Sequence, residues 1–549
     1  MQRGRTAAPS EPAVAGRATM KSLLVVAAEN GSLPPMRLGD REVSGKVSAI
    51  GDIVCESAHA VAQKDCEATI ITPAYGAFNR MPGARQVARL KVGFSDKMET
   101  VFVYEVLGRP DRDLVRNLVL DHPVFSAGGA GRIYCSDTPR DDNGLDARRF
   151  ALFCTAVAEG LLQKTFGVFE TVHLHDWPAA FLLMLRHCHR AYRVLRSQRC
   201  IFTLHDLSKQ GVFPFAQDES SFASWYPDLG YNQNQLADPA RADHFNATAC
   251  AIRLADGVHV LSSAYAEEIV QPGNAAHPGG EGLHEDLAKT GDEGRLFGIL
   301  GGCEYHSAPL TVVETWEELR AVSRARVLRW AAAQAQLASS HFMAHHRLTK
   351  LTNERPRMLL TSTGPIDDRN MALFRQRGSD GKPALYHLLD KLGSFGVFFI
   401  MGTGAARHEQ FLTEASARYD NLVFLNGVSD ALEQALYALG DLFVKASAIE
   451  PGVGTHLYAQ RAGQPCLVHL VGGLKDTVEH EKNGFGFNGY TPVEQADGLV
   501  EAVDQALTMF DEHQVEWLKL RRASSAAKFE WSRTAERLLQ ELYVVPHRD

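Results

Sequence analysis

The chain has 549 residues, which is too long for a single hydrophobic core, so two or more domains are expected. Its apolar content of 45% and charged content of 22% are typical of a globular protein in water. The net charge of -8 argues against a nucleic-acid-binding protein, which needs a basic surface. An anionic substrate would therefore need a local cluster of cations.

The cysteines and the apolar runs indicate the cellular compartment of the protein. The nine cysteines are scattered singly, which is typical of reduced thiols and not of a disulfide framework or a zinc site. No apolar run reaches the roughly 18 residues that a membrane-spanning helix needs. Residues 1–19 lack an apolar core, so we expect a disordered tail, an extension before a start at Met20, or a short transit peptide. We expect a cytoplasmic enzyme with no membrane or nucleic-acid partner.

The first half of the chain alternates between β-runs and helical stretches. Runs at 21–29 and 68–76 flank a segment with helical spacing, which predicts a βαβ opening. Further β-runs end at 176, 206 and 262, each followed by a helical stretch. This alternation predicts a parallel sheet, with functional residues where its strands end.

A long helical stretch separates this half from a second series of β-runs. The runs after it are 357–363, 396–404, 421–427, 441–447 and 465–473. Two Rossmann-like halves joined in this way would face each other across a cleft. The expected division is a tail over 1–19, a first domain over 20–310, a helical linker over 311–354, a second domain over 355–525, and a terminal helix over 526–549 that packs back on the first domain.

Two strand ends in the first half carry unusual polar residues. GKVSAIGDIV (45–54) opens a helix with Lys46 beside it, which suits a phosphate, although a plain helix cap has the same pattern. HLHDWPA (173–179) places His173 and His175 on one face of a strand. No third ligand is evident, so polar substrate contacts or core histidines are favoured over a metal site.

Three further stretches look like the walls of a cleft. His205 ends a strand in TLHDLSKQGVFP (203–214), and the QGVFP turn follows it. Glu450 precedes a glycine-containing loop, and Gly472 and Gly473 open another helix. Two helix starts on neighbouring strands would make a cradle for a diphosphate, whereas either loop alone is an ordinary turn.

In chain order these stretches resemble the motifs of bacterial glycogen synthases and plant starch synthases. KVSAIGDI is similar to the family's K-T-G-G-L-G-D-V, HLHDW to H-x-H-D-W, and TLHDLSKQGVF to T-x-H-N-x-x-x-Q-G-x-F. IEPGVGTHLYAQRAG is similar to F-E-P-C-G-L-x-Q-L-Y-A-M-R-Y-G, and VGGLKDTV to T-G-G-L-x-D-T-V. The resemblance runs from about residue 21 to 543 and implies a GT-B fold, two Rossmann-like parallel-sheet domains facing a central cleft.

Carried over position by position, the resemblance implies a set of catalytic residues and a set of substrate-binding residues. The catalytic positions are Asp176, His205, Arg369 and Glu450. The substrate-binding positions are Lys46, Gly51, Asp52, Tyr134, His175, Gly452, Gly472, Gly473 and Leu474. Glu450 and His205 would contact the transferred glucose, while Lys46 and the glycine pair would meet the donor phosphates.

The chain departs from the family in STGPIDDRNM (362–371). The family has S-R-x-x-x-x-K at this strand end, two cations that stabilise the departing diphosphate. Arg369 takes the Lys position, but Gly364, or Thr363 if the turn is shifted, takes the Arg position. Ser48 and Ala49 likewise replace the Gly-Gly after Lys46, and an insertion at about 30–45 precedes that loop.

The resemblance implies transfer of glucose from a nucleotide-glucose to the non-reducing end of an α-1,4-glucan, with retention. ADP-glucose is favoured and UDP-glucose stays open; no metal or other cofactor is expected, and a homo-oligomer stays open. The altered phosphate loops leave two alternatives, a glucosyltransferase with another donor or acceptor and a glucan-binding protein without activity. An active transferase requires Arg369 and Lys46 to face the diphosphate. Pairing of Arg369 with Asp367 or Asp368 would favour the inactive protein.

Overall fold

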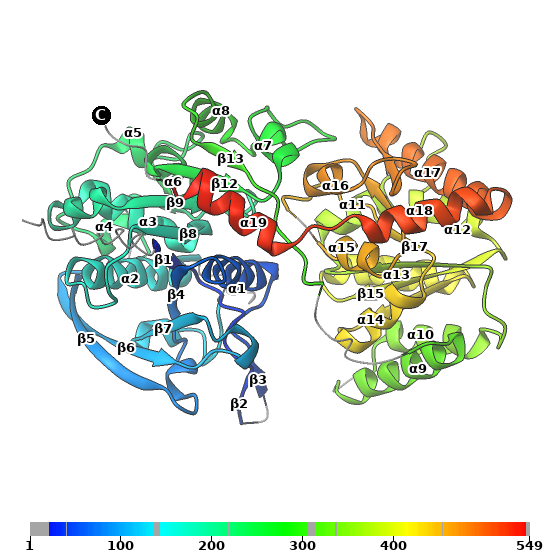
Figure 1. Cartoon of the computed structure of the whole chain (residues 1–549), viewed down its shortest axis with the longest axis horizontal. Helices are drawn as coiled ribbons and strands as arrows, with labels where there is room; N and C mark the ends of the chain where they lie inside the picture. The colour runs from blue at the N-terminus through cyan, green and yellow to red at the C-terminus, as the bar shows by residue number, and fades with distance from the viewer. Residues whose placement is uncertain are drawn as a thin grey trace, which may run out of the picture.

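Two α/β domains lie side by side (Figure 1). The computed structural model describes residues 21–39, 41–135, 143–216, 220–305, 313–334, 337–452 and 454–544. The tail expected at 1–19 lies outside these residues, as do the last five residues of the terminal segment.

The first domain is built on a mixed sheet with the strand order β13-β12-β9-β8-β1-β4-β7-β6-β5. Neighbours from β13 to β7 are parallel, whereas β7, β6 and β5 pair antiparallel. This antiparallel edge is not apparent in the alternating pattern, because it comes from a hairpin that turns at Ser95 and Asp96, with φ of 49° and 57°. The strands are β1 (Lys21–Val26), β4 (Cys66–Pro73), β5 (Arg85–Phe94), β6 (Lys97–Val106), β7 (Val115–Asp121), β8 (Thr171–His175), β9 (Arg199–Thr203), β12 (Gly257–Val260) and β13 (Leu296–Gly298).

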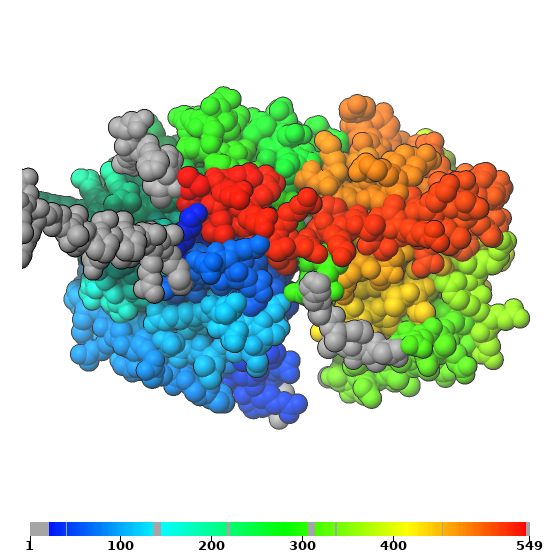
Figure 2. All heavy atoms as spheres, in the orientation of Figure 1, coloured from blue at the N-terminus to red at the C-terminus, as the bar shows by residue number. Residues whose placement is uncertain are grey.

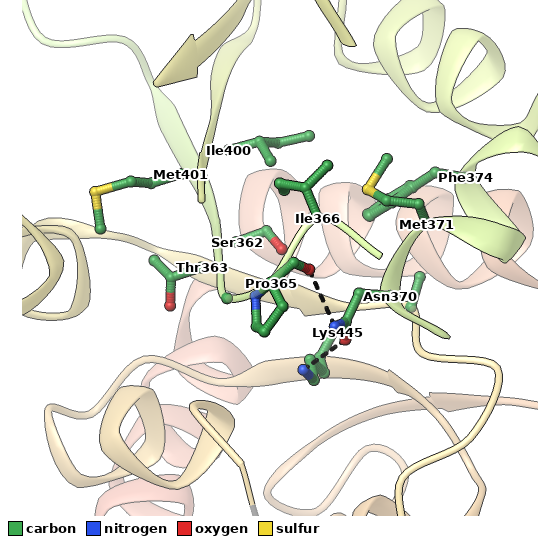
Figure 3. Close-up of a pocket in the computed structure, with 12 residues that line it drawn as sticks. Ser362, Thr363, Pro365, Ile366, Asn370, Met371, Phe374, Ile400, Met401 and Lys445 are labelled. Carbon is green, nitrogen blue, oxygen red and sulfur yellow. Dashed lines mark hydrogen bonds between the residues drawn. The ribbon is translucent and has the colours of Figure 1, made fainter. Parts of the chain in front are cut away.

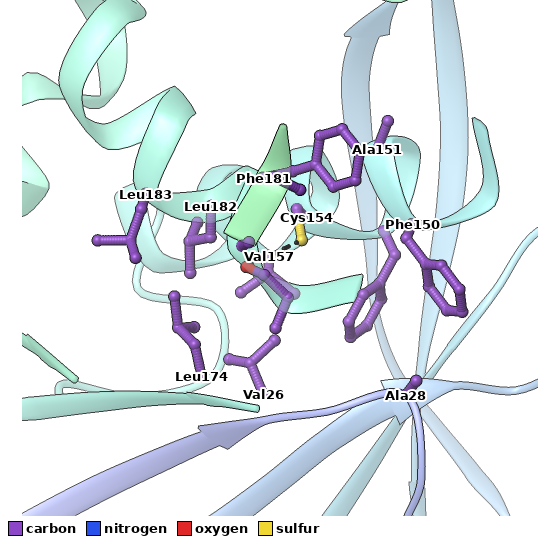
Figure 4. Close-up of a cluster of buried hydrophobic side chains, with 14 of the residues drawn as sticks. Val26, Ala28, Phe150, Ala151, Cys154, Val157, Leu174, Phe181, Leu182 and Leu183 are labelled. Atoms are coloured by element: carbon purple, nitrogen blue, oxygen red, sulfur yellow. Dashed lines mark hydrogen bonds between the residues drawn. The ribbon is translucent and has the colours of Figure 1, made fainter. Parts of the chain in front are cut away.

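Apolar helices cover this sheet. Figure 4 shows Val26 and Leu174 of the sheet facing Phe150, Val157 and other side chains of α2 and α3. Burial raises the pKa of the Cys154 thiol in this cluster, and none of the nine cysteines forms a disulfide, so they pack as small apolar residues. The main helices are α1 (Ala49–Ala62), α2 (Asn143–Leu162), α3 (Asp176–Cys188), α6 (Ala247–Leu254), α7 (Ser263–Ile269) and α8 (His284–Asp292).

The second domain has a fully parallel sheet with the strand order β16-β15-β14-β17-β18-β19. Its strands are β14 (Met358–Thr363), β15 (Gly396–Gly402), β16 (Leu422–Asn426), β17 (Leu442–Lys445), β18 (Cys466–His469) and β19 (Gly484–Phe487). Its helices include α11 (Asp368–Arg375), α12 (Ala384–Leu392), α13 (Ala406–Arg418), α14 (Asp430–Leu439), α15 (His456–Arg461), α16 (Gly472–Thr477) and α17 (Pro492–Glu512).

The helices of the expected linker pack on the second sheet. They are α9 (Trp316–Ala332), which begins with a capping box at Thr315 and Glu318, and α10 (Ser339–Lys350). Their buried apolar side chains share one cluster with residues of β14, β15 and β16. Because both helices bury an apolar face there, α9 and α10 form a layer of the second domain.

The end of the chain returns from the second domain to the first. After α18 (Gln514–Ala526) the backbone bridges Glu530 to Cys303, and α19 (Trp531–Arg537) packs against α1. The Tyr543 hydroxyl then lies 2.7 Å from Nδ1 of His173 in the first sheet. Figure 2 shows this segment lying across one face of both domains.

The insertion before the Lys46 loop folds as a small hairpin. β2 (Met36–Leu38) and β3 (Arg41–Val43) pair antiparallel. At its base the Asn30 amide donates to the Gly45 carbonyl at 2.8 Å. The two ends of the insertion are therefore adjacent in the structure. For this reason the insertion does not displace Lys46 from the end of β1.

In both sheets the strand order reverses next to the first strand of the domain. β1 has β4 on one side and β8 on the other, and β14 has β15 on one side and β17 on the other. Ligands of open parallel sheets bind at the carboxyl ends of the strands, where the order reverses. The residues that follow β1, β8, β14 and β17 are therefore the first candidates for a site.

Candidate active site

A carboxylate occupies the loop assigned to the donor phosphates. Glu29, which follows β1, is fully buried and accepts hydrogen bonds from the amides of Val47 (2.8 Å) and Ser48 (2.9 Å). The Ser48 hydroxyl donates to the other Glu29 oxygen at 2.7 Å. The loop thus binds an anion, as its sequence suggests, but in this structure that anion belongs to the protein. Sequence reasoning missed Glu29, although it is a charged residue at the end of an apolar strand.

Lys46 is paired within the same loop. Its ammonium lies 2.6 Å from both carboxylate oxygens of Asp52. The two side chains are 40% and 46% exposed, so the pair lies at the surface. Gly51 is needed here because a Cβ would meet the Lys46 Cβ at 2.4 Å. The predicted contacts of these three residues with donor or acceptor stay predictions.

Tyr134 contacts the same buried carboxylate. Its hydroxyl donates to Glu29 at 3.3 Å. Burial and the Glu29 carboxylate raise the pKa of the phenol well above its usual range, so it is a neutral hydrogen-bond donor.

Asp176 and His205 form the buried centre of the first domain's half of the site. The Asp176 carboxylate accepts the His205 amide at 2.7 Å, and Asp176 has φ of 56°, a strained conformation for a residue other than glycine. Burial raises the pKa of Asp176 to about 8, so its carboxyl group is largely protonated at neutral pH.

The two histidines beside Asp176 are stacked and neutral. His175 Nδ1 lies 2.9 Å from His205 Nε2, and burial lowers the pKa of His205 to about 3. His175 Nε2 and His205 Nδ1 are buried and have no hydrogen-bond partner among the described residues. Buried ring nitrogens without a partner are suited to form hydrogen bonds with the hydroxyl groups of a sugar.

His173 has no free ring nitrogen. Nδ1 lies 2.7 Å from the Tyr543 hydroxyl and Nε2 lies 2.5 Å from the Thr203 hydroxyl, which also lies 2.8 Å from Nδ1 of His259. His173 is therefore a satisfied core histidine. The described residues contain no group of histidine, cysteine and carboxylate side chains that could hold a metal ion.

Arg369 crosses from the second domain into this centre. Its guanidinium donates to Asp206, the residue after His205, at 2.7 Å. Burial opposes its charge, but the Asp206 and Glu450 carboxylates outweigh burial and raise the pKa of Arg369. Asp367 instead caps α11 at the Asn370 amide, and Asp368 pairs with Arg407 and His408. Arg369 thus points into the cleft and is not held by either neighbouring aspartate.

Glu450 lies beside Arg369 and a second cation. It is buried, and the Lys445 ammonium lies 3.4 Å from its carboxylate. Lys445 also donates to the Asn370 side chain at 2.8 Å, as Figure 3 shows. Sequence reasoning missed Lys445, although a lysine at the end of the apolar run DLFV was a visible signal.

The glycine pair packs tightly against the Glu450 loop. A Cβ at Gly472 would meet the Glu450 carbonyl at 1.9 Å, and one at Gly473 would meet the Gly452 carbonyl at 1.8 Å. The Gly472 amide donates to Glu268 at 2.8 Å and the Gly473 amide to the Glu450 carbonyl at 2.9 Å. Their predicted contact with phosphate stays a prediction that requires these amides to be released.

The two remaining substrate-binding positions are held by packing. A Cβ at Gly452 would meet the side chain of Leu261 from the first domain at 2.8 Å, so this glycine permits close approach of the two domains. Leu474 is fully buried in an apolar cluster of the second domain. Only its backbone could contact a ligand.

A cavity lies between the domains next to the Glu450 loop. It has a volume of about 310 Å³ and is lined by Tyr265 and His277 on one side and by Ile449 and Leu470 on the other. Among the residues that the structure describes, no helix is long and apolar enough to cross a membrane.

Comparisons with known proteins agree with this geometry. The model of the starch synthase catalytic domain matches residues 41–289, and that of the group 1 glycosyl transferases matches residues 384–509. The first match contains Lys46, Asp176 and His205, and the second contains Glu450 and the glycine pair. Each half of the cleft therefore comes from a known glycosyltransferase module.

Individual relatives match over most of their length. Glycogen synthase 2 of Geobacter sulfurreducens is 27% identical, over 83% of this chain and 89% of the relative. The glycogen synthase of Hydrogenovibrio crunogenus is 26% identical, over 90% and 96%. The catalytic domain of starch synthase IV from Arabidopsis thaliana, solved with ADP and acarbose, superposes with a TM-score of 0.70 at 24% identity and covers 96% of this chain and 99% of that one.

The order of the two modules, the near full-length relatives and the two-domain fold lead to one assignment. The chain is a glycosyltransferase with the GT-B fold, and it is similar to glycogen and starch synthases over most of its length.

Proposed function

We propose that the protein transfers glucose from a nucleotide-glucose to the non-reducing end of an α-1,4-glucan, with retention of the anomeric configuration. The observation that carries this proposal is the meeting of His205, Arg369 and Glu450 across the cleft, through the 2.7 Å bond between Arg369 and Asp206. Relatives named glycogen synthases support the glucan acceptor, and ADP in the starch synthase IV structure supports ADP-glucose over UDP-glucose.

Each half of the site has a separate task in such a transfer. His205 and His175 offer unpartnered ring nitrogens, and the protonated Asp176 holds the His205 backbone. These groups would orient sugar hydroxyls. Arg369 would stabilise the charge that grows on the departing diphosphate, since fixed charges in a dry cleft are typically the largest catalytic contribution. Glu450 would face the positive charge that develops on the glucose ring.

We propose that this transfer needs no metal ion. The charge on the leaving group would be balanced by side chains and backbone amides alone. Activity in the presence of a chelator should equal activity with added Mg²⁺. Loss of activity on chelation, restored by Mg²⁺, would contradict this part of the proposal.

The transfer itself is tested by incubating the protein with glycogen and radiolabelled ADP-glucose or UDP-glucose. Label should enter glycogen from ADP-glucose faster than from UDP-glucose. Glu450→Gln should abolish incorporation and leave the thermal midpoint near that of the native protein. A matched control is Glu479→Gln, which changes a glutamate that is 65% exposed and should have no effect. Equal activity of Glu450→Gln and the native protein would contradict the role of Glu450.

One observation favours a second candidate, a glucan-binding protein without activity. Arg369 and Lys46 are both paired with carboxylates, Asp206 and Asp52, so neither cation is free for a phosphate in this structure. Binding of glycogen without incorporation from either donor would support this candidate. Incorporation from a third nucleotide-sugar alone would instead support a glucosyltransferase with another donor.

A further inference from the structure

Gly364 leaves an open space at the end of β14. The family motif has an arginine at this position, but here Gly364 has φ of 135° and carries no side chain. Among the described residues, apart from its two chain neighbours, the heavy atom within 4 Å of a Cβ built on Gly364 is the Lys445 ammonium nitrogen, at 4.0 Å. The cation of Lys445 therefore borders the space that a side chain at 364 would enter.

The sheet register explains how Lys445 reaches this space. β14 and β17 are parallel neighbours, and Thr361 is paired with Phe443. Two residues further along each strand are Thr363 and Lys445, so the lysine ends its strand beside the residue that precedes Gly364. This is the position where the strand order of the second sheet reverses, and ligands bind such positions in open parallel sheets.

Lys445 is buried and held in a fixed orientation. Its side chain is 9% exposed, and its ammonium contacts the Asn370 amide oxygen at 2.8 Å and the Glu450 carboxylate at 3.4 Å. The Ser447 hydroxyl donates to the same Asn370 oxygen at 2.9 Å. An ammonium has three N–H donors, and these two acceptors account for two of them. Figure 3 shows Lys445 and Asn370 pointing toward each other beside Pro365.

We propose that Lys445 is a catalytic residue that binds the departing diphosphate, and that it supplies from β17 the charge that is missing at Gly364. This inference rests on the proposed function. Arg369 and Lys445 both interact with Glu450, from α11 and β17 respectively. The two cations therefore have the Glu450 carboxylate as a common electrostatic partner.

The transfer step defines what Lys445 does. The bond between the anomeric carbon and the diphosphate oxygen breaks, and its electron pair leaves with that oxygen. The acceptor hydroxyl oxygen forms the new bond to the anomeric carbon on the same face, and its proton passes to the departing diphosphate. Lys445 would stabilise the negative charge on the diphosphate while the old bond is breaking.

The alternative is that Lys445 only balances the buried charge of Glu450. The two roles differ in how the protein distinguishes ADP from AMP, because only ADP carries the terminal phosphate that a leaving-group cation would bind. Lys445→Met keeps most of the side-chain volume and removes the charge. We expect ADP to bind at least about tenfold more weakly to this variant, AMP affinity to change little, and kcat to fall about 100-fold. Calorimetric titrations with each nucleotide and the transfer assay measure these effects.

Two further variants keep the test decisive if Lys445→Met is poorly folded. Lys445→Ala should regain part of its activity when ethylammonium is added, because the amine can occupy the vacated space. Adding Gly364→Arg to Lys445→Met should raise activity above that of Lys445→Met alone. Lys391→Met serves as the control, since Lys391 is 45% exposed on α12 and pairs with Asp504.

The possible outcomes distinguish failure of this inference from failure of the proposed function. An active native protein whose Lys445→Met variant keeps the native kcat and the native ratio of ADP to AMP affinity would overturn the inference and leave the proposed function standing. A native protein that transfers no glucose but loses preference for ADP on Lys445→Met would overturn the proposed function and the catalytic role of Lys445, and would keep only its binding of the diphosphate. A native protein that binds neither nucleotide would overturn both.

Discussion

The two loops that carry the cations expected to face the diphosphate, Lys46 and Arg369, are stabilised in different ways. In the first domain, Lys46 pairs with Asp52 of its own loop, and the loop amides bind Glu29. In the second domain, Arg369 reaches across the cleft to Asp206. The first loop is therefore complete within one domain, whereas the second depends on contact between both.

This difference indicates which loop can respond to a ligand. Separating the domains would leave the Lys46 pair intact but would break the pair of Arg369 and Asp206. A diphosphate entering the cleft would compete with Asp206 for Arg369, so donor binding and domain contact are linked. The Lys46 loop has no equivalent link, because its partners move with it.

The largest effect is expected from Arg369. Arg369→Met should lower kcat/KM about 100-fold, equivalent to about 3 kcal/mol of lost transition-state stabilisation. Steady-state kinetics with ADP-glucose measures this loss. Arg369→Lys should retain more activity than Arg369→Met because it keeps a positive charge. A loss of kcat/KM smaller than the loss caused by Lys46→Met would mean that the Lys46 loop contributes more to catalysis than the Arg369 loop.

The buried histidines of the cleft give the second largest effect. The His205 pKa is lowered to about 3, below its ordinary value of 6.5, so its contribution to stability is present above pH 6.5 and is lost as the pH falls toward 3. Between pH 6.5 and 5 this amounts to about 2 kcal/mol. The contribution of Asp176 to stability has the opposite pH dependence. It is present at low pH and is lost as the pH rises through about 8.

Urea unfolding at several pH values tests this dependence. From pH 6.5 to 5 the Asp176 contribution opposes the His205 contribution in the native protein, whereas in His205→Asn only the Asp176 contribution is left, so the free energy of unfolding of His205→Asn should rise relative to that of the native protein as the pH falls. An identical slope in His205→Asn would show that His205 is not the source.

A smaller effect is expected from Asp206, where the family motif has asparagine. Asp206→Asn removes the carboxylate that neutralises Arg369 and leaves a side chain of the same size. ADP should bind several-fold more tightly, about 1 kcal/mol, because it no longer displaces a charged partner. Calorimetric titration measures the change. Weaker binding would mean that Asp206 helps to hold the donor instead of competing with it.

The smallest effect on stability is expected from Lys46. Its pair with Asp52 is half-exposed, and such pairs contribute about 0–1 kcal/mol. Lys46→Met should therefore lower the free energy of unfolding by no more than this. A loss above about 2 kcal/mol in denaturant titration would mean that the loop is not the independent unit described above.

Much of the fold could be predicted from the sequence because its strand runs and helix periodicity are local signals. The two sheets, the cleft and the strand-end positions of Asp176, His205 and Glu450 follow from them and from the family resemblance. The antiparallel hairpin that ends in β5 was missed, because two adjacent β-runs do not reveal their direction. The packing of α9 and α10 on the second sheet was missed because it depends on contacts distant in sequence.

The electrostatic partners of the site could not be predicted. Arg369 and Asp206 are 163 residues apart, and Glu29 and Val47 are 18 apart. Nothing in the spacing of residues indicates that these groups meet, since the pairs form only when separate strand ends come together. The missing cation at Gly364 could be found from sequence, but its neighbour Lys445 required the register of β14 and β17.

The retaining α-1,4-glucosyl transfer proposed for the cleft can be tested directly. Glycogen is labelled with the native protein and radiolabelled ADP-glucose, and the product is then digested with an exo-acting hydrolase specific for α-1,4 linkages. The label should enter glycogen and be released as the terminal sugar. Label that resists this digestion, or glycogen that stays unlabelled, would contradict it.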